Sequence, residues 1–600
     1  MSENRTESVP VLIVGGGGAG LTMSTALSLR GIPSILINMR PGTSVLPKAH
    51  VLNQRTMEIF TELGVAEEIY ARTCPPENMR YTGWYAGLNG DREHFGRQLG
   101  KLEAWGGGYS DPDYIAASPC ATSNLPQIRL EPLLLARAEE VGSDGSVRFN
   151  HELTALEVRE DGVSATIADH NDGSAYTIEA KYLIAADGGR TVGRMLGIGM
   201  TGPTDLQKMI SIHMTADLKP WLPDDEVLIR WFVNPDFGGS WSGVLVAMGP
   251  DHWGGSSEEW VFHMQYATDD PDAMQEERVL ERMRATLGLS DHQFEVHKIS
   301  SWVLEGVIAD EFRRGPVFLI GDAAHRHPPT GGLGLNSAVH DAYNLQWKLA
   351  AVLSGQASEA LLDTYETERR PVDQHNVDNA LRNAMNHFTI DQALGVSPDQ
   401  SGEENWEALM PLWESRPDSV EKRHALNAAI DSQTMEFRHH NVEFGYTYES
   451  TAIVADGSPA PAALDETRLY VPSTRPGHPL PHAFVEREGD RVPLGSLVAG
   501  EFLVIAGEDG HDWIRAAETI GSELGVPVRG ITVGVLEGDY IDVRAAWLKQ
   551  REIGRTGAIV VRPDRYIAYR SSDGVADPAQ ELREVFGRIT AQRAPESQTV

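Results

Sequence analysis

The stretch VLIVGGGGAG, residues 11–20, decides the fold of the first part of this chain. Its first four residues are an apolar run that predicts a short buried strand, and five glycines and one alanine follow within six positions. The segment LTMSTALSLRG, residues 21–31, carries apolar residues at helical spacing and stops at a glycine, which predicts a helix. The stretch therefore joins a strand to a helix through a glycine-rich turn.

This turn has the Gly-x-Gly-x-x-Gly spacing of a dinucleotide-binding site. Each glycine is entropically costly to order, so the run needs a reason. In such a turn the first glycine bends the chain, the second lets a phosphate approach, and the third lets helix and strand pack closely. Backbone N–H groups and the helix dipole then bind the pyrophosphate. The residues expected to do this are Gly15, Gly17, Gly18, Ala19 and Gly20.

The second strand of this unit, residues 34–37, is followed by an amide where such folds usually carry a carboxylate for the ribose hydroxyls. That position holds Asn38, and Arg40 comes two residues later. An amide can bind a hydroxyl, although with less strength than a carboxylate. We expect Asn38 and Arg40 to contribute a weakened contact at the ribose end of the cofactor.

The composition excludes several classes of protein. The 600 residues include 86 Asp and Glu against 51 Lys and Arg, a net charge of −35, which argues against a nucleic-acid or anionic-membrane partner. Cys74 and Cys120 are the only cysteines, so a disulfide framework and a cysteine zinc site are excluded. No apolar stretch is long enough to span a bilayer, and the first ten residues are polar, unlike a signal peptide. We expect a cytoplasmic protein of more than one domain.

Changes in pattern along the chain divide it into four parts. Residues 147–184 and 207–305 carry β-like runs, residues 355–450 are mostly helical in pattern, and ADGSPAPAAL at 455–464 reads as a linker. The expected parts are a discontinuous nucleotide-binding domain (1–200 and 306–390), a β-sheet substrate domain (76–125 and 201–305), a helical region with the linker (391–464), and a separate α/β unit (465–600).

Two further motifs indicate that the nucleotide is FAD rather than NAD alone. They are AADGGRTVGR at 185–194 and GDAAHRHPPTGGLGLN at 321–336, and each lies between an apolar strand and a helix. Asp322 is placed to bind a ribityl or ribose hydroxyl, and the helix that opens at Asn336 offers a positive end to a reduced isoalloxazine. His325 and His327 look like a metal pair, but no carboxylate or cysteine is spaced to complete a site, so we expect no metal.

With the three motifs in this order, the chain resembles the flavin-dependent aromatic hydroxylases of the p-hydroxybenzoate hydroxylase class. The segments most similar to the group of 2,4-dichlorophenol 6-monooxygenases and phenol hydroxylases are KAHVLNQRTME (48–58), LPQIRLEPLL (125–134) and residues 321–350. The resemblance implies an α/β fold with a Rossmann-like FAD-binding domain, an inserted β-sheet substrate domain and a C-terminal thioredoxin-like domain. Residues 465–600 contain no cysteine, so this last domain would have no thiol redox role and would cover the flavin domain or support a homodimer.

The resemblance also implies the cofactor-binding residues. Arg55 would reach the phosphates, Gln127 would lie near the flavin, and Asp187 with Gly188 would serve both FAD and the passing nicotinamide. Asp322, after Gly321, would bind the ribityl chain. The residues expected beside the isoalloxazine are Pro329, Gly332, Gly334, Leu335 and Asn336. Some of these residues have a structural alternative: Asp322 as a helix cap, Asp187 as a turn residue and Arg55 as a surface arginine.

The activity implied is FAD-dependent hydroxylation of a small phenolic or hydroxylated heteroaromatic substrate, ortho to its hydroxyl. NADH or NADPH would reduce FAD, and O₂ would react through a C4a-hydroperoxyflavin. The candidate catalytic base is His50, because its titration range suits removal of a phenol proton; its structural alternative is a packing residue. Asp236 and Arg230, on the pocket-wall sheet, would assist. The competing functions are a flavin monooxygenase that tailors a polyketide or pyridine, and a non-catalytic flavin-fold binding protein.

Overall fold

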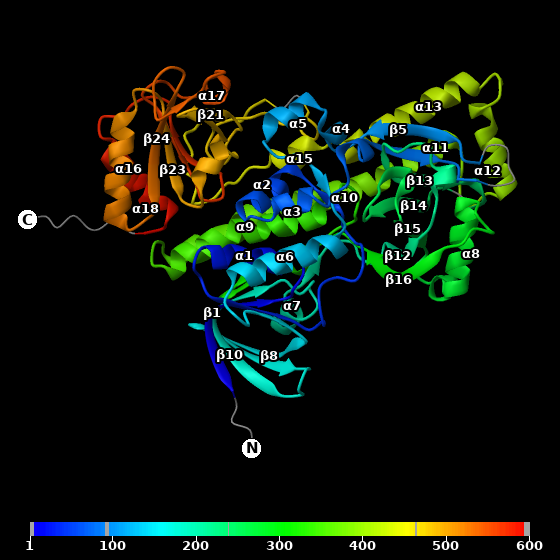
Figure 1. Cartoon of the computed structure of the whole chain (residues 1–600), viewed down its shortest axis with the longest axis horizontal. Coiled ribbons are helices and arrows are strands. Elements are labelled where there is room, and N and C mark those ends of the chain that lie inside the picture. Colours follow the sequence, from blue (N-terminus) through cyan, green and yellow to red (C-terminus); the bar gives the residue numbers. More distant parts are fainter. Residues whose placement is uncertain (1–4, 90–94, 238, 463–464, 593–600) are drawn as a thin grey trace, which may run out of the picture.

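Three large sheets surround two long central helices (Figure 1). The computed structural model describes residues 5–89, 95–237, 239–462 and 465–592. The central helices are α9 (Leu333–Leu353) and α10 (Thr364–Asn386). In Figure 1 the sheet that contains β1 lies below them, the sheet that contains β12 lies to the right, and the C-terminal sheet lies to the left.

The first sheet is built on the strand that leads into the glycine-rich turn. Its eight strands have the order β18-β19-β10-β1-β2-β7, with β9 and β8 added beside β10. β1 pairs in parallel with β2 and β10, and residues 11–14 are buried, which explains why this run is apolar throughout. The strands are β1 (Thr6–Val14), β2 (Ser34–Asn38), β7 (Val147–Phe149), β8 (His151–Arg159), β9 (Gly162–Asp169), β10 (Ala175–Ala185), β18 (Arg313–Arg314) and β19 (Val317–Leu319).

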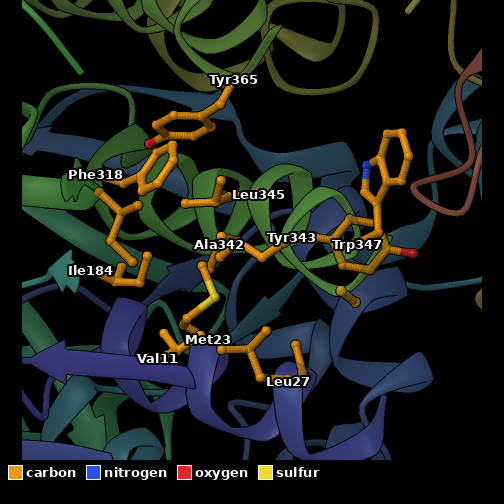
Figure 2. Close-up of a cluster of buried hydrophobic side chains, with 14 of the residues drawn as sticks. Val11, Met23, Leu27, Ile184, Phe318, Ala342, Tyr343, Leu345, Trp347 and Tyr365 are labelled. Atoms are coloured by element: carbon orange, nitrogen blue, oxygen red, sulfur yellow. The ribbon is translucent and has the colours of Figure 1, made fainter. Parts of the chain in front are cut away.

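Two helices from distant parts of the sequence cover this sheet in one layer. α1 (Gly18–Leu29) is the predicted helix after the glycines, and it packs beside α9. Figure 2 shows side chains of β1 and α1 meeting α9 and β19 in one apolar cluster; the labelled residues include Val11, Met23, Leu27, Ala342 and Phe318. Because α9 is buried on nearly all sides, the position of its first turn is fixed by packing.

The second sheet has seven strands in the order β16-β12-β15-β14-β13-β4-β5. β4 comes from far upstream and pairs in parallel with β13, so the chain contributes to this sheet on two separate passes. α8 (Glu276–Leu287) packs on one face. The strands are β4 (Tyr81–Tyr85), β5 (Gln98–Glu103), β12 (Gln207–Thr215), β13 (Val227–Asn234), β14 (Gly239–Gly249), β15 (Glu259–Tyr266) and β16 (Glu295–Leu304).

The C-terminal unit has a separate seven-stranded sheet, ordered β22-β21-β25-β24-β23-β26-β27, with α16 (His511–Leu524) and α18 (Pro578–Ile589) packed together beside it. β23 pairs in parallel with β24 and antiparallel with β26. The strands are β21 (Phe484–Arg487), β22 (Asp490–Pro493), β23 (Phe502–Ala506), β24 (Val528–Gly534), β25 (Tyr540–Ile541), β26 (Ala558–Val561) and β27 (Ile567–Ser571). The predicted fold class is confirmed. Among the helices in the described ranges, none combines the length and the apolar character needed to cross a membrane.

A buried ion network attaches this C-terminal domain to the two central helices. Arg562 lies 2.6 Å from Glu368 of α10 and also pairs with Asp564, while Lys348 of α9 lies 2.7 Å from Glu368. The side chains of all four are at most 2% exposed. Burial alone would raise the pKa of Glu368, but the two cations outweigh it and hold the pKa below its usual range. The network therefore depends on every partner being present.

Arg562→Met should destabilise the protein strongly, because Glu368 and Asp564 would stay buried after losing their guanidinium. Removing one partner of a buried ion pair costs about 3–5 kcal/mol, so the free energy of unfolding measured in urea should fall by that amount. The matched control is Arg583→Met in the same domain, which loses a half-exposed pair with Glu523 and should change stability little. Equal effects of the two substitutions would contradict this account.

Candidate active site

The glycine-rich turn is held so closely that side chains are excluded. A Cβ added to Gly15, whose φ is +118°, would lie 2.1 Å from the carbonyl oxygen of Ala186, and one on Gly20 would lie 1.9 Å from the carbonyl oxygen of Gly15. Gly17 is the N-cap of α1, and no side chain caps this helix. The first backbone N–H groups of α1 are therefore available to an anion, as a pyrophosphate site requires.

The three motifs that are distant in sequence meet around this turn. A Cβ on Gly18 would lie 2.7 Å from Leu335 Cδ1, and one on Gly321 would lie 3.4 Å from the Cβ of Ala19. The second motif joins them, because a Cβ on Gly189 would lie 3.1 Å from the backbone oxygen of Asp322. The structure thus brings residues 15–20, 185–194 and 321–336 together, and we refer to the place where they meet as the groove. These close glycine contacts fit an extended dinucleotide lying against bare backbone.

At the ribose end of the groove, Asn38 is joined by an acidic residue that sequence reasoning missed. Asn38 lies beside Gly16 and donates weakly, at 3.4 Å, to the Gly42 carbonyl oxygen. Glu131 of α6 (Gln127–Val141) lies 3.6 Å from the position of a Cβ on Gly17. Its carboxylate accepts a hydrogen bond from the Ser44 N–H at 2.6 Å and another from Gln127 Nε2. The sequence feature that could have identified Glu131 is its i, i+4 spacing from Gln127, which puts both side chains on one helix face. Arg40 is exposed.

Asp322 has a carboxylate that the protein does not use. The residue is exposed on the short turn after β19, and its side chain makes no hydrogen bond or ion pair with the described part of the chain. Its neighbour Gly321 is buried and donates its N–H to Asp341 Oδ2 at 2.9 Å. The backbone of the turn is therefore held by a buried hydrogen bond, whereas the Asp322 carboxylate is exposed. An exposed carboxylate of this kind suits binding of a hydroxyl-bearing ligand.

Two residues predicted to contact the cofactor, Asp187 and Asn336, use their side chains to hydrogen-bond backbone groups of the protein. The Asp187 carboxylate accepts hydrogen bonds from three N–H groups of its own turn, those of Gly189 (3.0 Å), Thr191 (2.7 Å) and Val192 (2.8 Å). Asp187 thus holds the shape of its own turn, and Gly188, with a φ of +72°, completes it. The Asn336 amide bonds the backbone of Val51, Asn53 and Gly332. These hydrogen bonds join the loop before α2 to the loop before α9.

The structure gives Arg55, predicted to reach the phosphates, protein partners of its own. Arg55 lies on α2 (Gln54–Glu62), 2.7 Å from Glu58, with its guanidinium 4.4 Å from the centre of the Phe444 ring. The residue is 3% exposed and points toward the interface with the C-terminal domain. The surface alternative is wrong. α2 begins at Gln54 because Asn53 caps it through the Thr56 N–H, and Arg55 follows directly.

His50 lies on the loop that Asn336 fastens, and its hydrogen bond defines its tautomer. His50 Nδ1 is 2.5 Å from Asn124 Oδ1, which can only accept, so Nδ1 carries the proton and the lone pair lies on Nε2, for which the described residues provide no hydrogen-bond partner. Burial lowers the pKa of His50 below its usual value, and the Asn124 hydrogen bond offsets part of this. The imidazole is therefore neutral at pH 7 and able to accept a proton.

The second sheet presents only one of its faces to His50. His263 of β15 lies near His50, and together with burial this neighbour lowers the His263 pKa to about 4. His263 pairs across the sheet with Val244, which pairs with Trp231. These residues share a face because side chains alternate along each strand. Ser211 of β12, 2.8 Å from His263 Nδ1, belongs to the same face.

Arg230 and Asp236 are absent from this face, which corrects their predicted assisting role. Arg230 precedes Trp231 on β13, so it points to the opposite side, where it donates to the Asp224 carbonyl oxygen at 2.5 Å. Asp236 is exposed in the turn after β13 and accepts from Trp406 Nε1 at 3.0 Å. Sequence reasoning placed both on the pocket wall without assigning a face; a period-2 reading would have picked His263.

His325 lies beside two carboxylates, and the sequence spacing did not predict them. Its Nε2 is 2.8 Å from Asp341 of α9 and 3.7 Å from Asp373 of α10, and these three side chains offer metal-ligand atoms within 4.8 Å of one another. Arg369, however, lies between the two carboxylates, 2.8 Å from an oxygen of each. A guanidinium in that position satisfies the carboxylates and opposes a second cation, so the cluster is a buried ion network beneath Gly321.

Curated enzymes match the chain over nearly its whole length. A 2,4-dichlorophenol 6-monooxygenase from Delftia acidovorans is 34% identical and covers 96% of this chain and 97% of its own length. A phenol 2-monooxygenase from Pseudomonas sp. (strain EST1001) is 33% identical, with 98% and 93% covered. A tetracenomycin A2 monooxygenase-dioxygenase from Streptomyces glaucescens is 34% identical, with 98% covered in both.

Solved structures match equally broadly, and the family follows from them. The flavin-dependent monooxygenase PieE in complex with FAD and substrate has a TM-score of 0.89 and 37% identity, covering 98% of this chain and 99% of its own. Aklavinone-11 hydroxylase with FAD and aklavinone has a TM-score of 0.77 and 30% identity, covering 99% and 100%. The FAD binding domain family matches residues 8–380, and the family described as aromatic-ring hydroxylase, C-terminal, matches residues 473–591. The chain therefore belongs to the FAD-dependent aromatic-ring hydroxylases and is a flavoprotein monooxygenase.

Proposed function

We propose that this enzyme hydroxylates a phenolic substrate ortho to its hydroxyl group, with NADH or NADPH as reductant and O₂ as co-substrate. The observation that carries the proposal is His50, a neutral imidazole whose free Nε2 lies on the loop between the flavin groove and the second sheet. When bound, FAD supplies the redox chemistry and the activation of O₂. The chain has to bind the phenol, remove its proton and keep water out.

The groove residues are assigned to FAD by the groups they leave available. The uncapped N-terminus of α1, reached through residues 15–20, would bind the pyrophosphate. The Asp322 carboxylate would accept hydrogen bonds from the ribityl chain, and the first turn of α9, at Gly334 and Leu335, would lie beside the isoalloxazine. Asn38 and the exposed Arg40 would complete the adenosine end. Gln127, whose amide donates to Glu131, would support that end.

His50 would take the phenol proton on Nε2. Asn124 holds the Nδ1–H, so the ring cannot present its proton to the substrate in the wrong tautomer. Loss of the phenol proton enriches the aromatic ring at the ortho carbon, where an electrophilic oxygen reacts. Trp231 and Val244 on the facing side of the sheet provide an apolar wall, and they are 5% and 7% exposed.

A second candidate function is hydroxylation of a larger aromatic natural product. Three relatives favour it by what they act on, because aklavinone-11 hydroxylase is solved with aklavinone and two other relatives carry the tetracenomycin name. The chain is as similar to these as to the chlorophenol enzymes, at 30–34% identity. The protein and the chemistry would be the same in both cases, and only the substrate would differ.

The test is consumption of NADH or NADPH by the purified yellow protein, with phenols and larger hydroxyaromatics supplied one at a time. Stimulated consumption together with a product heavier by one oxygen, ortho to the original hydroxyl, is expected for an accepted substrate. Consumption without a hydroxylated product, or no stimulation by any hydroxyaromatic compound, would contradict the proposal and favour a non-catalytic flavin-binding protein.

Asp322→Ala should weaken FAD binding, because it removes a charge-assisted hydrogen bond to the cofactor. Such a bond contributes roughly 1.5–3 kcal/mol, which corresponds to about a tenfold or greater increase in the Kd for FAD. The Kd can be measured by adding FAD to the apoprotein and following flavin fluorescence. The matched control is Asp269→Ala, an exposed aspartate in the turn after β15, which should retain FAD affinity close to that of the wild type. Unchanged affinity in Asp322→Ala would show that the carboxylate does not bind FAD.

His50→Gln should slow hydroxylation by about 10²–10⁴-fold while FAD stays bound, because a general base contributes that much. In the wild type, kcat/KM should fall as the pH drops through the lowered pKa of His50, below its ordinary value of about 6.5. In the variant this acid limb should vanish, and the rate should recover as the pH approaches the pKa of the phenol itself. Profiles of equal height and shape would make His50 a packing residue.

A further inference from the structure

The second sheet carries a hydrogen-bonded chain of three side chains on the face that His50 approaches. Trp302 Nε1 of β16 donates to Ser211 Oγ of β12 at 3.0 Å, and Ser211 Oγ lies 2.8 Å from His263 Nδ1 of β15. Trp302, Ser211 and His263 are all partly exposed, as His50 is, so they border accessible space. The chemistry assigned to His50 uses none of the three.

This chain defines the tautomer of His263. Ser211 Oγ accepts from Trp302, and His263 Nδ1 is the one acceptor that the described residues offer to the Ser211 hydroxyl proton. Burial and, after it, the charge of His50 lower the pKa of His263 to about 4, so the imidazole is neutral at pH 7. A neutral imidazole that accepts at Nδ1 carries its proton on Nε2. His263 therefore has a donor at Nε2, to which the described part of the chain supplies no acceptor.

His50 has the opposite tautomer. Its Nδ1–H donates to Asn124, so its lone pair lies on Nε2. In each ring Nδ1 is bonded to the carbon that joins the ring to the backbone, whereas Nε2 lies at the far end. Each histidine therefore uses its near nitrogen for the protein and leaves its far nitrogen for a ligand. His50 offers an acceptor there, and His263 offers a donor.

The residue after His50 holds this loop against the second sheet. Val51 belongs to the same apolar cluster as Trp231 and Val244, and Val244 is the cross-strand partner of His263. Because cross-strand partners share a face, the loop covers the face on which His263 lies. The effect of the His50 charge on the pKa of His263 agrees with this placement.

A second connection fixes the loop from its other side. The carbonyl oxygen of His50 accepts the Leu125 N–H at 2.8 Å. Arg129, four residues further on, donates to the Met248 carbonyl oxygen of β14 at 2.8 Å and lies 2.8 Å from Glu259 of β15. The segment that holds His50 is thus anchored on the strand that carries His263, so the two imidazoles keep a defined separation.

We propose that His263 is a further catalytic residue, whose Nε2–H donates a hydrogen bond to the phenolic oxygen while His50 Nε2 takes the proton from that oxygen. This inference rests on the proposed function. In the step, the phenol O–H bond breaks, its proton bonds to His50 Nε2, and its electron pair stays on the oxygen as phenolate. His50 becomes an imidazolium, and His263 stays neutral and keeps its own proton. Since hydrogen bonds to an ionised acceptor are stronger than those to a neutral one, the His263 donor favours the phenolate over the phenol.

The test measures kcat/KM of the holoenzyme with phenol and with 2,4-dichlorophenol, whose chlorine atoms make its hydroxyl more acidic. His263→Leu should lower kcat/KM for phenol by about 10²–10³-fold, which is the effect of removing one donor to a developing oxyanion. The loss should be smaller for 2,4-dichlorophenol, because its phenolate needs less stabilisation. The difference between the two losses is the readout, since a disturbance of the structure would slow both phenols equally.

Matched variants accompany this measurement. His263→Gln keeps an N–H donor near the position of Nε2 and should recover part of the lost rate. The control is His297→Leu, an exposed histidine of β16 whose Nε2 lies 2.7 Å from Thr215 Oγ1, which should leave both kcat/KM values close to those of the wild type. FAD content reports folding. If His263→Leu does not retain FAD, Ser211→Ala is the second variant; it lets the His263 proton move to Nδ1 and should slow phenol more than 2,4-dichlorophenol.

The outcomes separate this inference from the proposed function. Unchanged kcat/KM in His263→Leu, or equal losses for the two phenols, would overturn the role of His263, while hydroxylation by the wild type would keep the proposed function. If the wild type hydroxylates neither phenol, the proposed function fails and the inference falls with it.

Discussion

The carboxylate of Asp341 holds together the parts of the molecule that form the flavin groove. From α9 it accepts the Gly321 N–H, pairs with His325 and meets Arg369 of α10. Burial alone would raise the pKa of Asp341, but Arg369 and His325 outweigh it, so the carboxylate stays charged where no water reaches it. A buried charge tolerates no loss of its partners. The positions of the Gly321 turn, the first turn of α9 and the face of α10 are consequently tied to one another.

The same two helices also carry the C-terminal domain, so the cysteine-free unit is part of the support of the active site. Lys348 of α9 and Glu368 of α10 meet Arg562 in a network that is as buried as the one around Asp341. α2 lies in this interface as well, and its Arg55 and Glu58 are used there. Within this interface Arg55 is held by Glu58 and by the Phe444 ring.

The catalytic side of the groove is built from loops and helices rather than from the sheet. The second sheet contributes a wall of alternating side chains, while the loop at His50 and the loop at Gly331 lie between that wall and α10. Asn336 fastens the first of these loops to the second through three backbone hydrogen bonds. A residue on such a fastened loop keeps a defined position relative to the wall, which a base acting on a bound phenol would require.

Local patterns in the sequence determined the fold class, the cofactor and the family, because a strand, five glycines and a helix constrain the backbone within a few residues. The same motifs contain the glycines of residues 15–20, 188–189 and 321, which the structure brings together, whereas the roles of His50 and Asp322 stay predictions. Tertiary structure decided which side chains were already occupied. The Arg55 guanidinium, for example, lies over the ring of Phe444, which is distant in the sequence. The tertiary structure also decided which face of the second sheet each side chain occupies, and it places Arg230 away from His50. It brings Asp341 and Asp373 to His325, and Asn383 to Gly331. These contacts join residues 16 to 52 positions apart, and helix packing, which no local spacing encodes, sets their distances.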